Sequence, residues 1–176
     1  NLGKIYFNLI KKGFMQKDIL GIIKYSVASA ADARMGGLKV PIFSCFGSGS
    51  LGITLFIALG LLAENLKVTK DVLLKSIALA LLIVGLIKSK TGILTPSCGC
   101  MLAASPGVAA GSAFLLNGSR EQIKSAINLV FANIAGALCD GAKPGCALKM
   151  VTAASCAVES AYLALEGLKL EGKNGI

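Results

Sequence analysis

Apolar residues recur along the chain at helical spacing, and no segment sustains the alternation of apolar and polar residues that marks a strand. Between residues 18 and 34, for example, Ile19, Ile22, Ile23 and Val27 fall on one face of a helix. Residues 40–46 have an extended pattern, but one short strand makes no sheet. We therefore expect an all-α fold, with further helices over residues 4–12, 51–64, 69–88, 119–138 and 147–165.

Short polar sequences mark several of the expected helix ends. Ser119 and Gln122 form a capping box, in which each side chain satisfies a free backbone amide at the start of a helix. Thr69 is placed to cap the helix that follows it. Thr95-Pro96 has the pattern of an N-cap followed by a first-turn proline, which predicts another helix start there.

No linker, internal repeat or low-complexity tail divides the chain. Small side chains dominate residues 103–113, which lets helices pack very closely. We expect one multi-helix globular domain over residues 1–176, with buried central helices and Gly/Cys-rich loops. Because the chain starts without Met and ends in a run that is cut short, we also expect a fragment of a longer polypeptide.

The strongly apolar composition raises the question of a membrane protein, since 55% of the residues are hydrophobic and the mean hydropathy is +0.74. The longest apolar run, residues 77–87, has about half of the roughly 20 residues that a membrane span needs. The run over residues 51–63 is similarly short. No basic start leads into an apolar core and a cleavage site, as in a signal peptide. These patterns favour helices buried in a large core and no membrane.

Scattered lysines dominate the charge, which is +9 from 18 basic and 9 acidic side chains. No basic run is interleaved with aromatic residues, so nucleic-acid binding is not expected. One interpretation of the charge is an ordinary solvated surface. The other is a positive field that attracts a small anionic or zwitterionic substrate.

The six cysteines are not needed as disulfide staples in so apolar a chain, and a reducing, cytoplasmic location is expected. Cys98, Cys100 and Cys139 are soft ligands of the kind that hold iron–sulfur clusters, zinc or copper(I). Buried, unreactive thiols are the other interpretation, and it suits Cys45 and Cys156 better. The chain has no His, which excludes His-based zinc sites and His-dependent triads.

A Gly-rich loop opens the helix over residues 51–64. It contains Gly47, Ser48, Gly49 and Ser50, and the amides at such a helix start can hold a carboxylate or a phosphate. A tight interhelical turn is the alternative. The loop lacks the Lys-Ser or Lys-Thr of a Walker loop and the strand of a dinucleotide fingerprint.

Charged side chains in so apolar a chain lie either at the surface or paired near a site, and Arg34 and Asp140 raise that question. A lysine near a metal cluster accepts a proton if burial lowers its pKa. Lys143 and Lys90 are the candidates that the sequence offers, and a solvated helix end is the other interpretation of the segment Lys88-Ser-Lys90.

Four motifs together carry a resemblance to a known family. They are Ala31-Asp-Ala-Arg-Met-Gly-Gly37, Gly47-Ser-Gly-Ser50, Cys98-Gly-Cys100 and Cys139-Asp-Gly-Ala-Lys-Pro-Gly-Cys-Ala-Leu-Lys149. With these motifs the chain resembles the L-cysteine desulfidase family, which includes the YhaM-type proteins and belongs with the serine dehydratase alpha-chain superfamily. The resemblance covers residues 20–167, and its last motif is long and unusual.

The resemblance implies a [4Fe–4S] cluster that three Cys residues hold, with one iron left open. The downstream ligand maps onto Cys139, and the middle ligand maps onto either Cys98 or Cys100. Cys146 follows Cys139 at too short an interval to match the pattern. The family's upstream ligand has no match here, so the missing N-terminal part of the same protein is an expected partner.

The resemblance further implies β-elimination from a small amino-acid substrate, L-cysteine, which releases pyruvate, ammonia and sulfide. Substrate contacts are expected from Arg34, Asp140 and the loop over residues 47–50, and the base that removes the α-proton is expected to be Lys143 or Lys90. Dehydration of L-serine is the first alternative. A non-catalytic or membrane-associated helical bundle is the second, and a homo-oligomer stays open.

Overall fold

Helices make up the regular structure of the described residues, 1–92 and 94–170, in a computed structural model. There are seven α-helices and one turn of π-helix in this part of the chain, and no strand. The expected all-α fold is confirmed. The elements are α1 (Leu2–Lys11), α2 (Ile19–Met35), α3 (Gly49–Leu66), α4 (Lys70–Thr91), the π-helix η1 (Cys100–Ala104), α5 (Ser105–Leu115), α6 (Arg120–Ile134) and α7 (Cys146–Leu165).

Local capping explains where several helices begin. The predicted capping box is confirmed at α6, where the Ser119 N–H donates to Gln122 Oε1 at 2.8 Å and the Gln122 N–H donates to Ser119 Oγ at 3.3 Å. Thr69 caps α4 as predicted, because its Oγ1 accepts the Val72 N–H at 3.4 Å. Ser48 caps α3 in the same way.

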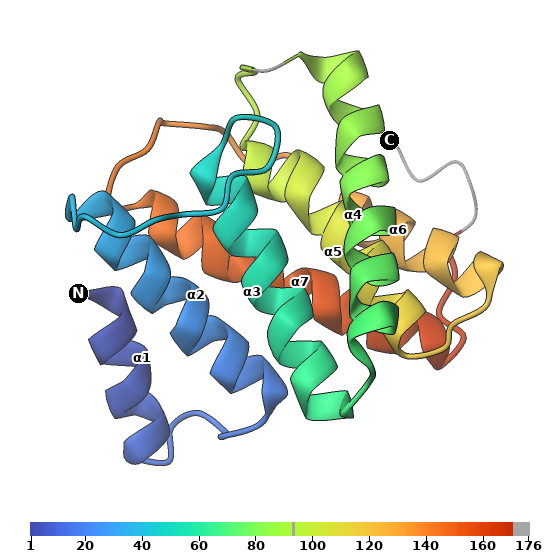
Figure 1. Ribbon diagram of the computed structural model, residues 1–176, viewed down its shortest axis with the longest axis horizontal. Coiled ribbons are helices and arrows are strands. Elements are labelled where there is room, and N and C mark those ends of the chain that lie inside the picture. The colour runs from blue at the N-terminus through green and yellow to red at the C-terminus, as the bar shows by residue number, and fades with distance from the viewer. Residues whose placement is uncertain (93, 171–176) are drawn as a thin grey trace.

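Helices α5 and α7 occupy the centre of the molecule. Helix α7 packs against α2, α3, α5 and α6, while α5 also packs against α4 and α6. In Figure 1, α7 passes behind α3, with α1 and α2 towards one side of the molecule and α4 and α6 towards the other. Every residue of α5 except Phe114 is buried, which confirms the expectation of buried central helices.

Small residues bring α4 and α5 into close contact, as the composition of residues 103–113 predicts. A Cβ atom on Gly107 would lie 2.7 Å from the Ala80 carbonyl oxygen. One turn further along, the buried Ser76 hydroxyl donates a 3.0 Å hydrogen bond to the Gly111 carbonyl. The backbones of α4 and α5 lie so close together that a side chain at either glycine would clash.

The prediction of a helix start at Thr95-Pro96 is wrong. The Thr95 hydroxyl donates to the Ser97 carbonyl at 2.8 Å, so this side chain does not cap a following helix. The helical region starts near Cys100 instead, where the N–H groups of Met101 and Leu102 donate to the Cys98 carbonyl at 3.1 and 2.8 Å. It opens as a π-turn, in which the Ser105 N–H donates to the Cys100 carbonyl.

The predicted length of the helix over residues 119–138 is also wrong, because α6 ends at Ile134. Ala137 and Cys139 form backbone hydrogen bonds with the segment around Ser97, and a residue paired in this way cannot continue a helix. The extended pattern over residues 40–46 produces only an isolated bridge between Cys45 and Ser48. Backbone pairing between distant segments therefore sets the helix ends that local sequence patterns do not predict.

Three helices in the described part of the chain, α3, α4 and α7, are long and apolar enough to cross a membrane by length and composition. Uninterrupted apolar runs do not identify these helices, because a single polar residue ends a run but lowers the mean hydropathy over 18 residues only slightly. The apolar segments of α3 and α7 are 56% and 61% buried inside the protein, whereas that of α4 is only 17% buried. Helix α4 therefore turns a broad apolar face outward.

Replacing Gly107 with Ala tests the close contact between α4 and α5. The added Cβ would meet the Ala80 carbonyl and Val84, so we expect Gly107→Ala to lower the free energy of unfolding by about 1–3 kcal/mol. Gly60→Ala is the matched control, because Gly60 also lies inside a helix and a Cβ there meets no atom within 4 Å. We expect the control to raise stability by about 0.5–1 kcal/mol. Urea unfolding followed by circular dichroism measures both, and equal midpoints would contradict the packing argument.

Candidate functional site

Three loops converge at one end of the helical bundle and surround a cavity of about 270 Å³. They are residues 36–48 before α3, residues 94–99 before η1 and residues 135–145 before α7, which lie towards the top of Figure 1. Each loop leads into the N-terminus of a helix. Free backbone amides at these three starts point a partial positive charge toward the cavity, which favours bound anions and thiolates.

Four of the six cysteines line this cavity: Cys98, Cys100, Cys139 and Cys146. The first, second and fourth are buried, whereas Cys139 is exposed at the mouth. The other two, Cys45 and Cys156, are buried outside the cavity lining, and burial raises the pKa of both thiols. Four cysteines therefore gather at one cavity, whereas Cys45 and Cys156 only fill the core.

The thiols of Cys98, Cys100 and Cys146 form a hydrogen-bonded row in which Cys100 is the central member. Hydrogen bonding from the Cys100 thiol lowers the pKa of Cys98 to about 6, and the backbone amides of Met101 and Cys100 lower it further against the opposing effect of burial. The same thiol lowers the pKa of Cys146 to about 7. Cys100, which donates to both neighbours, has its own pKa raised well above the ordinary value. Cys98 and Cys146 are therefore more acidic than ordinary thiols, and Cys100 is less acidic.

Backbone pairing positions two of these cysteines next to each other. The Cys98 N–H donates to the Ala137 carbonyl at 2.8 Å, and the Cys139 N–H donates to the Pro96 carbonyl at 2.7 Å. These bonds flank an antiparallel bridge between Ser97 and Leu138. They bring together two cysteines that lie 41 positions apart in the sequence.

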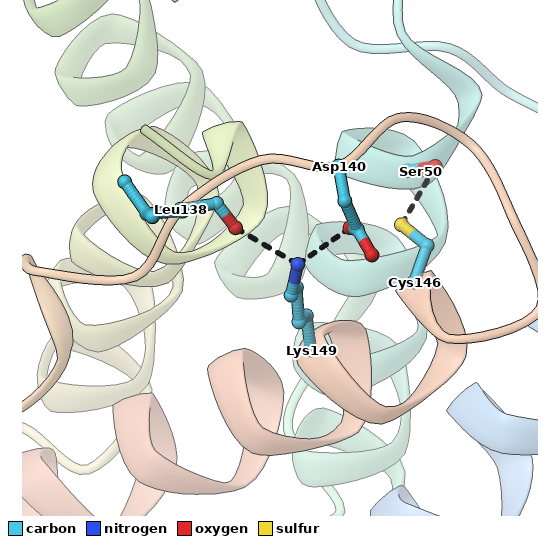
Figure 2. A network of polar contacts seen from close by, with 5 residues as sticks. All are labelled: Ser50, Leu138, Asp140, Cys146 and Lys149. Carbon is cyan, nitrogen blue, oxygen red and sulfur yellow. Dashed lines mark hydrogen bonds and ion pairs between the residues drawn. The ribbon is translucent and has the colours of Figure 1, made fainter. Parts of the chain in front are cut away.

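Lys149 of α7 fastens the loop that carries Cys139, as Figure 2 shows. Its ammonium group donates to the Leu138 carbonyl at 2.8 Å and forms an ion pair with the Asp140 carboxylate. The pair lowers the pKa of Asp140 and raises the pKa of Lys149. One contact is to the carbonyl of Leu138 and the other is to the carboxylate of Asp140. Lys149 therefore holds the loop on both sides of Cys139.

Arg34, at the end of α2, crosses to the start of α3. Its guanidinium donates to the Ser50 hydroxyl and packs over Gly49, where a Cβ would lie only 2.8 Å from Arg34 Nε. Ser50 in turn accepts a 3.9 Å contact from the Cys146 thiol, which links this group to the thiol row. A side chain at position 49 would displace the guanidinium, because the guanidinium occupies that space.

The cavity carries a positive charge on its wall. Arg34 and Lys88 line it, and none of the described lining residues is Asp or Glu. A Cβ on Gly99 would lie 3.6 Å from Lys88 Nζ, so this ammonium lies against the loop between Cys98 and Cys100. In a partly enclosed cavity, two cations attract an anionic ligand more strongly than they would in open water.

Most of the predicted site residues meet at this cavity, although their roles stay predictions. Its lining includes seven of them: Cys98, Cys100, Cys139, Arg34, Gly47, Ser48 and Ser50. Gly49 lies immediately behind the wall, under Arg34. Lys90 and Lys143 are exposed outside the lining, and Asp140 points away from it toward Lys149.

Lys88 and Cys146 also line the cavity, although neither was predicted from the sequence as a site residue. A signal for Lys88 was present, since Ser76, Ala80 and Val84 form the buried stripe of α4 and Lys88 continues it at the same four-residue spacing. Lys90 falls off this stripe. Cys146 begins the buried face of α7, two positions before the exposed Leu148, and only the tertiary fold brings it to Cys100.

Comparison with known proteins identifies the family of this chain. The family model of the serine dehydratase alpha chain matches residues 3–176. The chain belongs to this family. The superfamily that the sequence motifs indicate is thereby confirmed.

Curated relatives of this serine dehydratase alpha-chain family member are UPF0597 proteins. One from Clostridioides difficile is 40% identical over 167 residues, which cover 95% of this chain and 39% of the relative. One from Nitratidesulfovibrio vulgaris is 43% identical over 159 residues, which cover 90% of this chain and 36% of the relative. The chain thus spans about two fifths of the length of these relatives. No solved structure matches the chain.

Replacing Lys149 with Met tests how the loop around Cys139 is held. The variant keeps the apolar stem but loses the contacts to Leu138 and Asp140, so we expect amide exchange in residues 137–142 to rise on the order of three- to tenfold. Hydrogen–deuterium exchange with mass spectrometry measures this. Lys124→Met, on the exposed face of α6, is the control and should leave the loop unchanged. Unchanged exchange in the Lys149 variant would show that other contacts hold the loop.

Proposed function

We propose that this protein is a β-eliminating lyase that converts L-cysteine to pyruvate, ammonia and sulfide, with a [4Fe–4S] cluster held by Cys139, by Cys98 or Cys100, and by a third cysteine in the part of the polypeptide outside these 176 residues. One observation carries the proposal, namely that four thiols and two cations share a single cavity whose described lining has no carboxylate. Membership of the serine dehydratase alpha-chain family supports a lyase. The motif that runs from Cys139 to Lys149 supports L-cysteine as the substrate.

The cavity residues match an iron–sulfur cluster in their donor chemistry. Cluster ligands are thiolates, and Cys98 has a pKa of about 6, so it is largely ionised at neutral pH. Within the described residues no three His, Cys, Asp or Glu side chains are arranged to hold a single metal ion. A cluster is larger than one ion, and its third ligand is proposed to come from the part of the polypeptide outside these 176 residues.

The carboxylate of the amino acid is proposed to bind at Arg34 and the start of α3. The guanidinium offers a charge-assisted hydrogen bond, and the Ser50 hydroxyl beside it offers another polar contact. The amides that follow the Ser48 cap add the partial positive charge of a helix N-terminus. This arrangement orients the substrate with its Cα and Cβ toward the thiol row, since Ser50 contacts Cys146.

Lys88 is proposed as the proton acceptor, in place of Lys90 and Lys143. It is the lysine that lines the cavity, and its Nζ lies against Gly99, beside the proposed cluster ligands. In its neutral form the amine takes the α-proton, the Cβ–S bond breaks, and its electron pair leaves with the sulfur as a double bond forms between Cα and Cβ. The resulting enamine tautomerises, and water hydrolyses it to pyruvate and ammonia. When bound, the cluster supplies a Lewis acid that stabilises the leaving group.

Dehydration of L-serine is the second candidate, and the description of the matching family favours it. The same proton removal and carboxylate contacts would serve either substrate, and only the leaving group differs. The two are separated by measuring sulfide release and pyruvate release in parallel. A higher kcat/KM for L-serine than for L-cysteine would replace the first candidate with the second.

Cysteine variants of the full-length protein, reconstituted anaerobically with iron and sulfide, test the cluster assignment. We expect Cys139→Ala, and either Cys98→Ala or Cys100→Ala, to lose most of the bound iron and to release pyruvate at least about 100-fold more slowly, because a ligand is missing. Cys156→Ala is the matched control, since this buried thiol lies outside the cavity lining. It should keep its iron and its rate within about twofold. Normal iron content and normal rate in Cys139→Ala would defeat the assignment.

Arg34→Lys tests the carboxylate site. Lysine keeps the charge but loses the planar fork that contacts Ser50, so we expect KM for the amino acid to rise about 10- to 100-fold with a smaller change in kcat. Arg120→Lys is the matched control, because Arg120 begins α6 and is exposed. Steady-state kinetics of the reconstituted protein measures both parameters. An unchanged KM would remove Arg34 from the substrate site.

A further inference from the structure

A row of exposed apolar side chains runs from α4 to the mouth of the cavity. It consists of Leu82, Leu86, Phe46 and Leu94, which are 72%, 60%, 50% and 93% exposed. We call these four residues the apolar strip. The first two lie on the outward face of α4, and the last two line the cavity.

Phe46 joins the cavity end of the strip to α4. A Cβ on Gly85 would come within 2.8 Å of the tip of the Phe46 ring, so the ring packs directly on the helix beside Gly85. Phe46 has a φ of 47° and Gly47 a φ of 77°, in a tight turn closed by two hydrogen bonds between Cys45 and Ser48. A left-handed conformation is uncommon for a bulky residue, and here it holds a large apolar ring at the surface.

Single exposed apolar residues are common on protein surfaces, but contiguous ones beside a cavity mark an interaction site. Helix α4 as a whole supports this view, because only 17% of its apolar segment is buried, against 56% for α3 and 61% for α7. The other two long apolar helices are covered on most sides inside the fold, whereas α4 packs on α5 along one face and leaves the rest of its apolar segment outside.

The length of the relatives indicates what covers the strip. About three fifths of each lies outside the region that this chain matches, although the match covers 90% or more of this chain. A segment joined covalently to the fold docks at a high effective concentration, which a separate molecule does not have. A lipid surface fits less well, because it would seal Arg34 and Lys88 under hydrocarbon at the cavity mouth.

We propose that the apolar strip is the docking surface for the part of the polypeptide outside these 176 residues, and that docking places that part over the cavity mouth. The docked surface is apolar where it meets Leu82 and Leu86, and it covers Phe46 and Leu94 at the rim. The exposed Lys90, near the end of α4, favours an acidic side chain in the docked segment. This inference uses the exposed surface alone and does not depend on the proposed lyase activity.

Photo-cross-linking in the full-length polypeptide tests the proposal. Leu82→p-benzoylphenylalanine places a photoreactive group on α4, and Leu94→p-benzoylphenylalanine places one at the rim, where an exposed loop residue tolerates the change. Phe14→p-benzoylphenylalanine is the control, because Phe14 is 79% exposed on the turn between α1 and α2. The protein is prepared as a mixture of ¹⁴N and ¹⁵N copies, irradiated, digested and analysed by mass spectrometry.

We expect the probes at positions 82 and 94 to yield cross-links of a single isotope to peptides outside residues 1–176, at least tenfold more abundant than those from position 14. Mixed-isotope cross-links would show that a second copy covers the strip, and they would overturn the proposal. Cross-links to added lipid vesicles, or yields no higher than the control at both positions, would overturn it as well. Thermal unfolding of each variant checks that all three probes are carried by folded protein. The readout needs no cluster and no substrate, so an inactive protein leaves its outcome unchanged.

Discussion

Two backbone hydrogen bonds determine whether the candidate site exists at all. They run from the Cys98 N–H to the Ala137 carbonyl and from the Cys139 N–H to the Pro96 carbonyl. Neither segment is part of a helix, and without this pairing the two cysteines would lie on unrelated loops. The Lys149 contacts to the carbonyl of Leu138 and to Asp140 then fasten the paired loop to α7. The position of Cys139 at the cavity depends on this small piece of pairing between the two loops.

The helices could be predicted well because their signals are local. Apolar spacing and side-chain caps such as Ser119 and Thr69 act within a few residues, so they can be recognised in the sequence. The end of α6 and the start near Cys100 could not be predicted in this way, since backbone pairing between residues 96–98 and 137–139 overrides local preference. The same holds for the thiol row, because Cys146 meets Cys100 only through the packing of α7 beneath η1.

The candidate site could be predicted only in part from the sequence. Motifs identified most of the residues that line the cavity, but they could not rank the lysines. Lys88 and Lys90 differ by two positions, which on a helix turns one inward and the other outward. The buried stripe of Ser76, Ala80 and Val84 contains the information that distinguishes them, and it becomes visible once α4 is treated as packed on one side only. The helix face on which a lysine lies therefore indicates whether its side chain can reach the cavity.

The π-turn at η1 has a consequence for variation within the family. A π-turn arises when one extra residue is accommodated in a helix, and each residue in an α-helix turns the chain by about 100°. Here the turn lies between the Cys98-Gly-Cys100 segment and the buried helix α5. A one-residue deletion within residues 101–104 would restore a regular helix and turn Cys100 by about 100° relative to α5. Cys98 would keep its place, because its backbone is paired with Ala137. A single-residue gap in this region would therefore alter the position of one thiol of the Cys98-Gly-Cys100 segment and not the other.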